Sequence, residues 1–199
     1  MFKSFKTLAL VASLMAAGSM AYADGHAKGW TLDGDNSRLV FGSIKGDTTG
    51  EAHSFNTISG AVGADGAAMI EVDLASVQTN IDIRNERMLE HVFKGAGTAT
   101  LSANIDMSEV SELPVGGMTT FEIEGTLSLL GSEVDLDAEM FAVRLSDTSA
   151  MVTTNNIIFV ETEDLGITEG VNKLMELASL DSITRTSPVV MRLVFNLDE

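Results

Sequence analysis

The stretch Met69-Ile70-Glu71-Val72-Asp73-Leu74 alternates apolar and acidic side chains, so that Ile70, Val72 and Leu74 share one face. A period of two is typical of a half-buried β-strand. From about Asn80 the spacing becomes helical, and the next apolar residues gather on one side of the segment, namely Ile81, Met88, Leu89, Val92 and Phe93. This stretch therefore predicts an all-β protein with a helical insertion.

The same alternation runs through most of the chain. Phe121, Ile123 and Leu127, for example, alternate with Glu122 and Glu124. Glycine, proline, asparagine and aspartate separate the alternating segments, as expected of turns. The predicted strands cover residues 30–33, 37–44, 53–62, 69–79, 98–105, 121–129, 133–145, 151–160 and 189–197. Eight or nine strands in one domain favour a closed barrel over an open sheet, because closure removes exposed strand edges. We therefore predict an antiparallel barrel of about eight strands.

Two local features refine this prediction. The apolar face changes after Met140, where Phe141 and Val143 take over from the preceding alternation, and such a slip predicts a β-bulge. Residues 168–180 have a helical stripe, with Thr168 as the expected N-terminal cap. We expect this second helix to pack over a barrel mouth or a sheet face.

The N-terminus has the pattern of a secretory signal peptide. Lys3 and Lys6 precede an uncharged apolar run, and Ala21-Tyr22-Ala23 is a small-residue cleavage sequence. We therefore predict a signal peptide over residues 1–23 and a single barrel domain over residues 24–199. The protein has no cysteine, so no disulfide stabilises it. This combination favours the bacterial periplasm.

The charge balance argues against two classes of partner. Of 12 basic residues, Lys3 and Lys6 leave with the predicted signal peptide, so 10 remain against 29 acidic ones and the net charge falls from −17 to −19. Nucleic acids and anionic membrane surfaces require a basic patch, so neither is an expected partner. The acidity serves solubility or, alternatively, attraction of a cationic partner. No other apolar run is long enough to predict stable membrane insertion.

Several short motifs, in order, resemble the YceI-like family of bacterial periplasmic proteins. The resemblance covers Trp30 to about Leu145, with a closing strand at Val189 to Leu197. The residues that carry it are Trp30, Asp33, Ser37, Val40, Phe41, Phe55, Gly60, Ala75, Ser76, Thr79, Arg84, Gly125, Leu127 and Gly131. It implies a lipocalin-like antiparallel β-barrel of about eight strands with flanking helices. It also implies a central tunnel that holds a long amphiphilic lipid, usually a polyisoprenoid.

The chain departs from the family pattern in two places. The family has Arg-Asp-x-His-Leu where this sequence has Arg84, Asn85, Glu86, Arg87 and Met88. These changes affect any contact that this segment makes with a ligand head group. The segment over residues 161–181 is longer and more helical than in short members, so the barrel mouth is expected to differ.

The sequence contains none of the common catalytic motifs. His53 follows Glu51 by two residues and His91 follows Glu90, but neither spacing is a recognised metal-ligand pattern. We therefore predict no catalytic residues, no metal site and no cofactor other than a bound isoprenoid-type lipid. Arg84 and Arg87 are candidates to bind an anionic head group, or to pair with neighbouring carboxylates.

These observations predict a periplasmic protein that binds or carries an amphiphilic lipid, either a polyisoprenoid or an isoprenoid quinone. One alternative is an enzyme or redox accessory protein that acts on such a lipid. A second is a barrel filled with side chains that serves as a stress or interaction protein. We expect a monomer or homodimer. The predicted ligand-binding residues, which combine inward alternation with one cation at the mouth, are Phe41, Ile70, Val72, Leu74, Arg84, Phe121, Ile123 and Leu127.

Overall fold

The computed structural model describes residues 28–199, and in this range the chain forms twelve β-strands and two α-helices. The predicted signal peptide lies outside the described residues. The strands are β1 Trp30–Leu32, β2 Arg38–Lys45, β3 Thr49–Phe55, β4 Ile58–Val62, β5 Ala67–Asp73, β6 Val77–Gln78, β7 Thr98–Asn104, β8 Met118–Leu129, β9 Ser132–Ser146, β10 Ser149–Thr154, β11 Ile158–Glu161 and β12 Thr186–Leu197. The helices are α1 Asp82–Arg87 and α2 Thr168–Leu177, with short helical turns η1 Leu74–Ser76, η2 Met88–Val92 and η3 Met107–Glu109.

Eight strands close into a ring in the order β1-β4-β5-β7-β8-β9-β10-β12, because β12 pairs back to β1. At this junction Trp30 lies opposite Leu197, and every pairing around the ring is antiparallel. The predicted fold class, a closed antiparallel barrel of about eight strands with two helices, is confirmed.

At one end the barrel wall is continued by β2, β3 and β6. The long strand β12 pairs with both β1 and β2, and β2 pairs in turn with β3, and β3 with β6. The chain therefore breaks between β3 and β4, where the prediction had one strand over residues 53–62. Asn56 N donates to Ser76 O at 3.1 Å, and Thr57 O accepts from Asp73 N at 3.1 Å. These bonds to the η1 region replace the expected continuous ladder.

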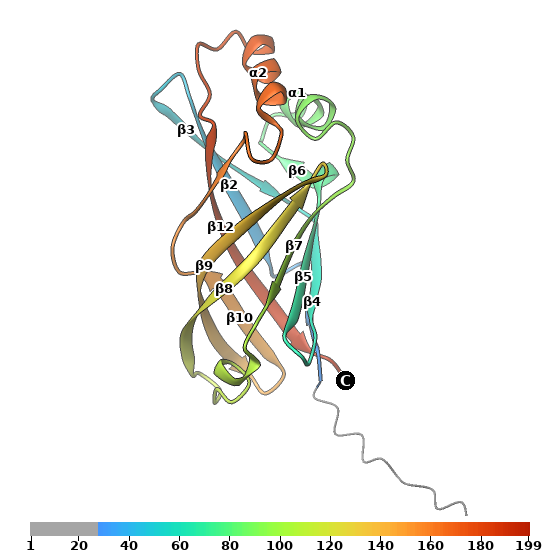
Figure 1. Ribbon diagram of the computed structural model, residues 1–199, viewed down its shortest axis with the longest axis vertical. Helices are drawn as coiled ribbons and strands as arrows, with labels where there is room; N and C mark the ends of the chain where they lie inside the picture. The colour runs from blue at the N-terminus through green and yellow to red at the C-terminus, as the bar shows by residue number, and fades with distance from the viewer. Residues whose placement is uncertain (1–27) are drawn as a thin grey trace, which may run out of the picture.

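Both helices lie at this same end of the barrel, next to one another and near the β2–β3 hairpin and β6 (Figure 1). We call this end the mouth. The α-helical segment α1 continues directly into η2, a turn of π-helix. Helix α2 packs closely on η2, because a Cβ at Gly170 would lie 2.4 Å from His91 O. None of the helices in residues 28–199 is long and apolar enough to cross a membrane.

The predicted cap of α2 is wrong. The N-cap residue is Ile167, which makes no side-chain capping bond. The Thr168 hydroxyl instead lies 3.0 Å from the Thr162 hydroxyl in the preceding loop. The Thr168 side chain therefore joins the start of α2 to the loop that precedes it.

The predicted bulge after Met140 is also wrong. Strands β8 and β9 pair without a register shift from Met118 opposite Val143 to Leu129 opposite Ser132. Met140 and Ala142 are both buried, so the inward alternation continues past Met140. The sequence suggested a slip because the inward residue Ala142 is small, whereas its neighbours Phe141 and Val143 are larger and more apolar. The irregularity lies further on, where Ser149 and Ala150 of β10 pair with Ser146 and Arg144.

Candidate functional site

The mouth half of the barrel encloses a cavity of about 460 Å³. Its wall is mostly apolar and comes from strands around the ring and from both helical segments. Met88 of η2 and Val171 and Leu174 of α2 contribute to it, so the helices complete the enclosure. The volume lies within the range of about 300–1,000 Å³ that small-ligand sites occupy. We call this the upper cavity.

Six of the eight predicted ligand-binding residues line the upper cavity: Phe41, Ile70, Val72, Leu74, Arg84 and Leu127. The other two, Phe121 and Ile123, face the lumen but line a separate cavity of about 100 Å³, the lower cavity. Their alternation with acidic neighbours is the same as that of Leu127, so the sequence did not separate them. Phe121 precedes Leu127 by six residues, which at about 3.3 Å per residue places it roughly 20 Å further from the mouth.

Aromatic side chains of β2 and β3 form one wall of the upper cavity. Phe41 lies directly opposite His53 on the neighbouring strand, and the two ring centroids are 5.2 Å apart. Phe41 also stacks on Phe55 at 5.3 Å, and Phe55 lies 6.0 Å from Phe93, which follows η2. These contacts join the barrel wall to the helical insertion.

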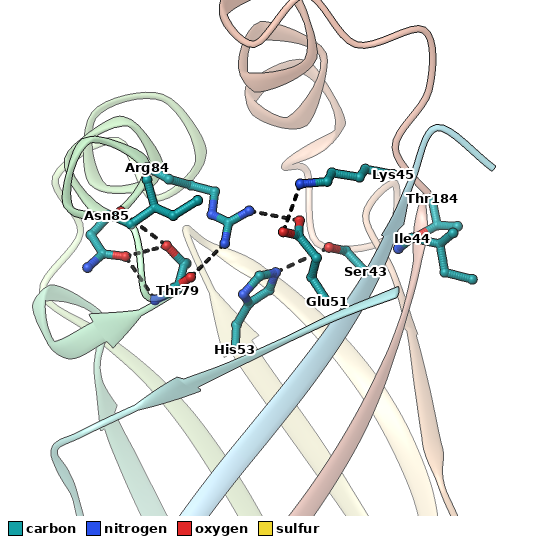
Figure 2. A network of polar contacts seen from close by, with 10 residues as sticks. Ser43, Ile44, Lys45, Glu51, His53, Thr79, Arg84, Asn85 and Thr184 are labelled. Carbon is teal, nitrogen blue, oxygen red and sulfur yellow. Dashed lines mark hydrogen bonds and ion pairs between the residues drawn. The ribbon is translucent and has the colours of Figure 1, made fainter. Parts of the chain in front are cut away.

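A cluster of polar groups lies where the upper cavity meets the mouth (Figure 2). The Glu51 carboxylate accepts from Lys45 Nζ at 2.9 Å and from an Arg84 terminal nitrogen at 2.7 Å. The other terminal nitrogen of Arg84 donates to Thr79 O at 2.6 Å. The His53 ring lies beside this group, with Nε2 3.2 Å from Ser43 Oγ. We call Lys45, Glu51, His53 and Arg84 the mouth cluster.

Asn85 fixes the backbone from which Arg84 extends. Its side-chain oxygen accepts from Thr79 N at 2.9 Å and from Thr79 Oγ1 at 2.6 Å. Thr79 is 1% exposed, so these bonds are well shielded from water. An aspartate, which the family pattern has here, offers the same acceptor oxygen. The departure at Asn85 therefore preserves a structural contact, and Asn85 does not line the cavity.

Two charge effects distinguish the mouth cluster. Burial, and then the nearby Arg84 charge, lower the pKa of His53 below its ordinary 6.5, so His53 is neutral at pH 7. Burial acts to raise the pKa of Glu51, but hydrogen bonds from Lys45 and Arg84 outweigh it and hold that pKa below its usual value. With Glu51 ionised, the mouth cluster carries one net positive charge, and Arg87 also lines the upper cavity.

The cluster also carries unused hydrogen-bonding capacity. Within residues 28–199, His53 Nδ1 and Arg84 Nε are buried and have no hydrogen-bond partner. A buried polar atom without a partner costs about 1–3 kcal/mol. Both atoms belong to residues that line the upper cavity, but the atoms themselves are shielded from it, so a ligand polar group reaches them only if these side chains turn.

The sequence-based prediction missed Lys45, Glu51 and His53 as site residues. Lys45 follows Phe41 by four residues on β2, and Glu51 precedes His53 by two residues on β3. The alternation that places Phe41 in the lumen therefore places these three side chains on the same face. From the sequence, Glu51 and His53 were considered only as a metal pair, for which their spacing is not a recognised pattern, and Lys45 was not considered. In the described range, no group of three or more His, Cys, Asp or Glu side chains is placed to hold a metal ion.

A closed antiparallel barrel with an apolar cavity and a few polar groups at one mouth is the architecture of barrel proteins that enclose a small apolar ligand. The comparison with known families specifies this class further. The model of the YceI-like domain matches residues 30–187. The chain therefore belongs to the YceI-like domain family.

Solved structures agree with this assignment. A polyisoprenoid binding domain from Saccharophagus degradans, implicated in plant cell wall breakdown, is 33% identical, with a TM-score of 0.83 over 85% of this chain and 98% of that one. BcnA from Burkholderia cenocepacia is 17% identical, with a TM-score of 0.63 over 82% and 98% of the two chains. A mutant CJ YCEI protein for nanotechnology applications is 14% identical, with a TM-score of 0.52 over 74% and 85%. No curated protein sequence matches the chain.

Proposed function

We propose that this protein binds and carries an amphiphilic lipid of the polyisoprenoid or isoprenoid-quinone type, with the tail in the upper cavity. The observation that carries the proposal is the mostly apolar cavity of about 460 Å³, which is open at the mouth. The 33% identical relative, which covers most of this chain, is a polyisoprenoid binding domain. The wall and the relative therefore point to the same chemical class of ligand.

The binding energy comes mainly from removal of the tail from water. Each buried CH₂ group contributes about 0.8 kcal/mol, against which the loss of ligand freedom must be set. The aromatic wall formed by Phe41 and Phe55 and the flexible Met88 side chain adapt to a branched tail. An isoprenoid tail offers many such groups and no polar ones along its length.

The mouth cluster is the proposed site of the polar head group. Arg84 Nε is a donor, and His53 Nδ1 is also a donor if the Ser43 hydroxyl donates to Nε2. A quinone carbonyl or a phosphate oxygen is a suitable acceptor for either atom once its side chain turns toward the cavity. The net positive charge at the mouth favours an anionic head group over a cationic one.

We also propose that the protein acts in the periplasm. The support is the signal-peptide pattern with cleavage after Ala23, together with membership of the YceI-like family. N-terminal sequencing of protein from the periplasmic fraction should begin at Asp24. A chain that begins at Met1 in this fraction would contradict the processing proposal.

The central experiment is lipid extraction of the purified protein followed by mass spectrometry. We expect an isoprenoid lipid at near-stoichiometric occupancy. Leu127→Trp, which places a large ring in the upper cavity, should lose this lipid. Ile123→Trp is the matched control, because the same type of change on the same strand enters only the lower cavity. A wild-type protein without lipid, or equal occupancy in both variants, would contradict the proposal.

A further inference from the structure

Three side chains line both cavities: Ile70 of β5, Leu101 of β7 and Met191 of β12. Ile70 and Leu101 are direct partners across the β5–β7 pairing. In the ring of eight strands β12 is four positions from β7, so Met191 comes from the opposite wall. These three residues therefore separate the upper cavity from the lower one, and we call them the constriction.

Two residues beside the constriction, Gly60 and Gly125, have no side chain. A Cβ at Gly60, which pairs with Ile70, would lie 2.7 Å from Ile70 Cδ1. A Cβ at Gly125 would lie 3.6 Å from Leu101 Cδ1. Ile70 and Leu101 thus lie against glycines of the adjacent strands. The width of the lumen at this level is therefore set by three apolar side chains.

Met191 is the most adaptable member of the constriction. Its side chain is 6% exposed and unbranched, and such a side chain changes rotamer more readily than Ile or Leu. Beyond it the lower cavity has an apolar wall that includes Phe121, Ile123 and Met140. The second cavity is therefore suited to receive the end of an apolar tail, but only past Met191.

We propose that the constriction sets the length of lipid tail that this protein accepts, and that Met191 is the residue that determines it. The inference rests on the proposed lipid-binding function. A tail that ends above Met191 is held wholly in the upper cavity. A longer tail must displace the Met191 side chain to gain contacts in the lower cavity, and its last isoprene units otherwise add no affinity.

The test uses a series of defined prenols, namely farnesol, geranylgeraniol and solanesol, with native mass spectrometry of the delipidated wild-type protein. We expect affinity to rise with tail length and then to stop rising. Met191→Ala should extend the rise to longer tails, with a gain of at least about tenfold for solanesol relative to geranylgeraniol, equivalent to about 1.4 kcal/mol. Leu101→Ala, which opens the constriction from the opposite wall, should act in the same direction.

Ile58→Ala is the matched control. Ile58 is also a buried apolar residue, at 4% exposure, but it lines neither cavity. Its truncation loosens the core without changing a cavity wall, so the length profile should stay that of the wild type. If Met191→Ala does not fold, Met191→Val makes a smaller opening with a residue suited to a strand.

The outcomes separate the two proposals. A wild-type protein that binds none of the prenols contradicts the lipid-binding function itself. A wild-type protein that binds them, with folded variants at Met191 and Leu101 that keep an unchanged length profile, overturns only the role of the constriction. An equal shift in Ile58→Ala would also overturn it, because general loosening of the core would then explain the result.

Discussion

Arg84 is held by two acceptors of different kinds, a carboxylate on the barrel wall and a backbone carbonyl at the start of α1. Glu51 in turn receives a second cation, Lys45. The carboxylate therefore neutralises part of the positive charge at the mouth and also joins the barrel wall to the helical insertion. Removal of the Glu51 carboxylate should change both the free energy of unfolding and the preference for an anionic over a neutral ligand.

Glu51→Gln should lower the free energy of unfolding by about 1–3 kcal/mol, because a hydrogen-bonded charge is removed from a mostly buried position. It should also increase the affinity for an anionic lipid, since Lys45 and Arg84 then lack their counter-charge. Urea denaturation measures the first effect, and titration with an anionic and a neutral lipid of equal tail length measures the second.

Glu176→Gln is the control for this change. Glu176 pairs with Lys173 on the exposed surface of α2, and surface pairs contribute about 0–1 kcal/mol. If Glu176→Gln lowered the free energy of unfolding as much as Glu51→Gln, the mouth cluster would have no special role in stability. Equal affinity of Glu51→Gln for both lipids would argue against a head group at the cluster.

The lowered pKa of His53 predicts that the free energy of unfolding depends on pH. Its pKa is lowered in the folded protein by burial and by Arg84, so below the ordinary value of 6.5 the unfolded chain takes up a proton that the folded chain does not. This contribution to stability is complete above pH 6.5 and declines as the pH falls. The free energy of unfolding should therefore decrease from about pH 7 to pH 5, measured by urea denaturation at each pH.

His53→Gln should make that decline shallower, because glutamine does not titrate. The two proteins must be compared above pH 4.5, the ordinary pKa of Glu51. The pKa of Glu51 is lowered in the folded protein, so at more acidic pH its protonation also reduces the free energy of unfolding. An equally steep decline in His53→Gln would show that His53 is not its source.

At the scale of elements, the contact between α2 and η2 depends on one residue without a side chain. A Cβ at Gly170 would lie 2.4 Å from His91 O and 2.6 Å from Val92 Cα, and backbone atoms cannot move aside cheaply. Both segments supply wall residues to the upper cavity. The closeness of this contact therefore determines how completely the cavity is enclosed.

Gly170→Ala should lower the free energy of unfolding by about 1–3 kcal/mol, the usual range for overpacking, and should speed lipid release. Thermal unfolding and transfer of a fluorescent lipid to vesicles measure the two effects. Gly50→Ala is the control, since nothing lies within 4 Å of a Cβ at that position. A folded Gly170→Ala protein with wild-type release would mean that α2 does not enclose the ligand.

Most elements of the barrel could be predicted from the sequence, because strands with one face in the lumen show a clear period of two. The helical insertion was recognisable for the same reason, as the place where that period ends. The failures lie where a local contact outweighs the pattern. Thr168 bonds to Thr162 instead of capping α2, and the break at Asn56 and Thr57 arises from bonds to η1.

The site was predictable only in part. Alternation identifies residues that face the lumen, and it placed Phe41, Val72 and Leu127 on the wall of the upper cavity. Alternation does not show how far from the mouth a residue lies, so it predicts Ile123 to be a ligand-binding residue together with Leu127. The pairing of Glu51 with Arg84 joins residues 33 apart in the sequence, and no local pattern predicts it.

At the scale of the whole molecule, a cavity of about 460 Å³ leaves much of the upper lumen without packing partners when no ligand is bound. A ligand that binds only the folded state stabilises it by mass action, by about 2.7 kcal/mol at one hundred times its dissociation constant. Delipidated protein should therefore melt about 5–10 °C below the loaded protein, measured by calorimetry.

Refilling with the extracted lipid should restore the melting temperature. Ile123→Trp should show the same difference between empty and loaded protein, while Leu127→Trp should show little difference. An unchanged melting temperature after verified delipidation would mean that the cavity is not the ligand site.

The closure of the ring by β12 has a consequence for how the chain folds. The bond from Thr31 Oγ1 to Asp198 Oδ1, 2.7 Å long, joins residues 167 positions apart, and β12 pairs with β1, β2, β10 and β11. Such long-range contacts make folding slow, since a large loop must close before they form. Until β12 arrives, β1 and β10 remain open edges with no partner on one side, and this interval is when the chain is most exposed to aggregation.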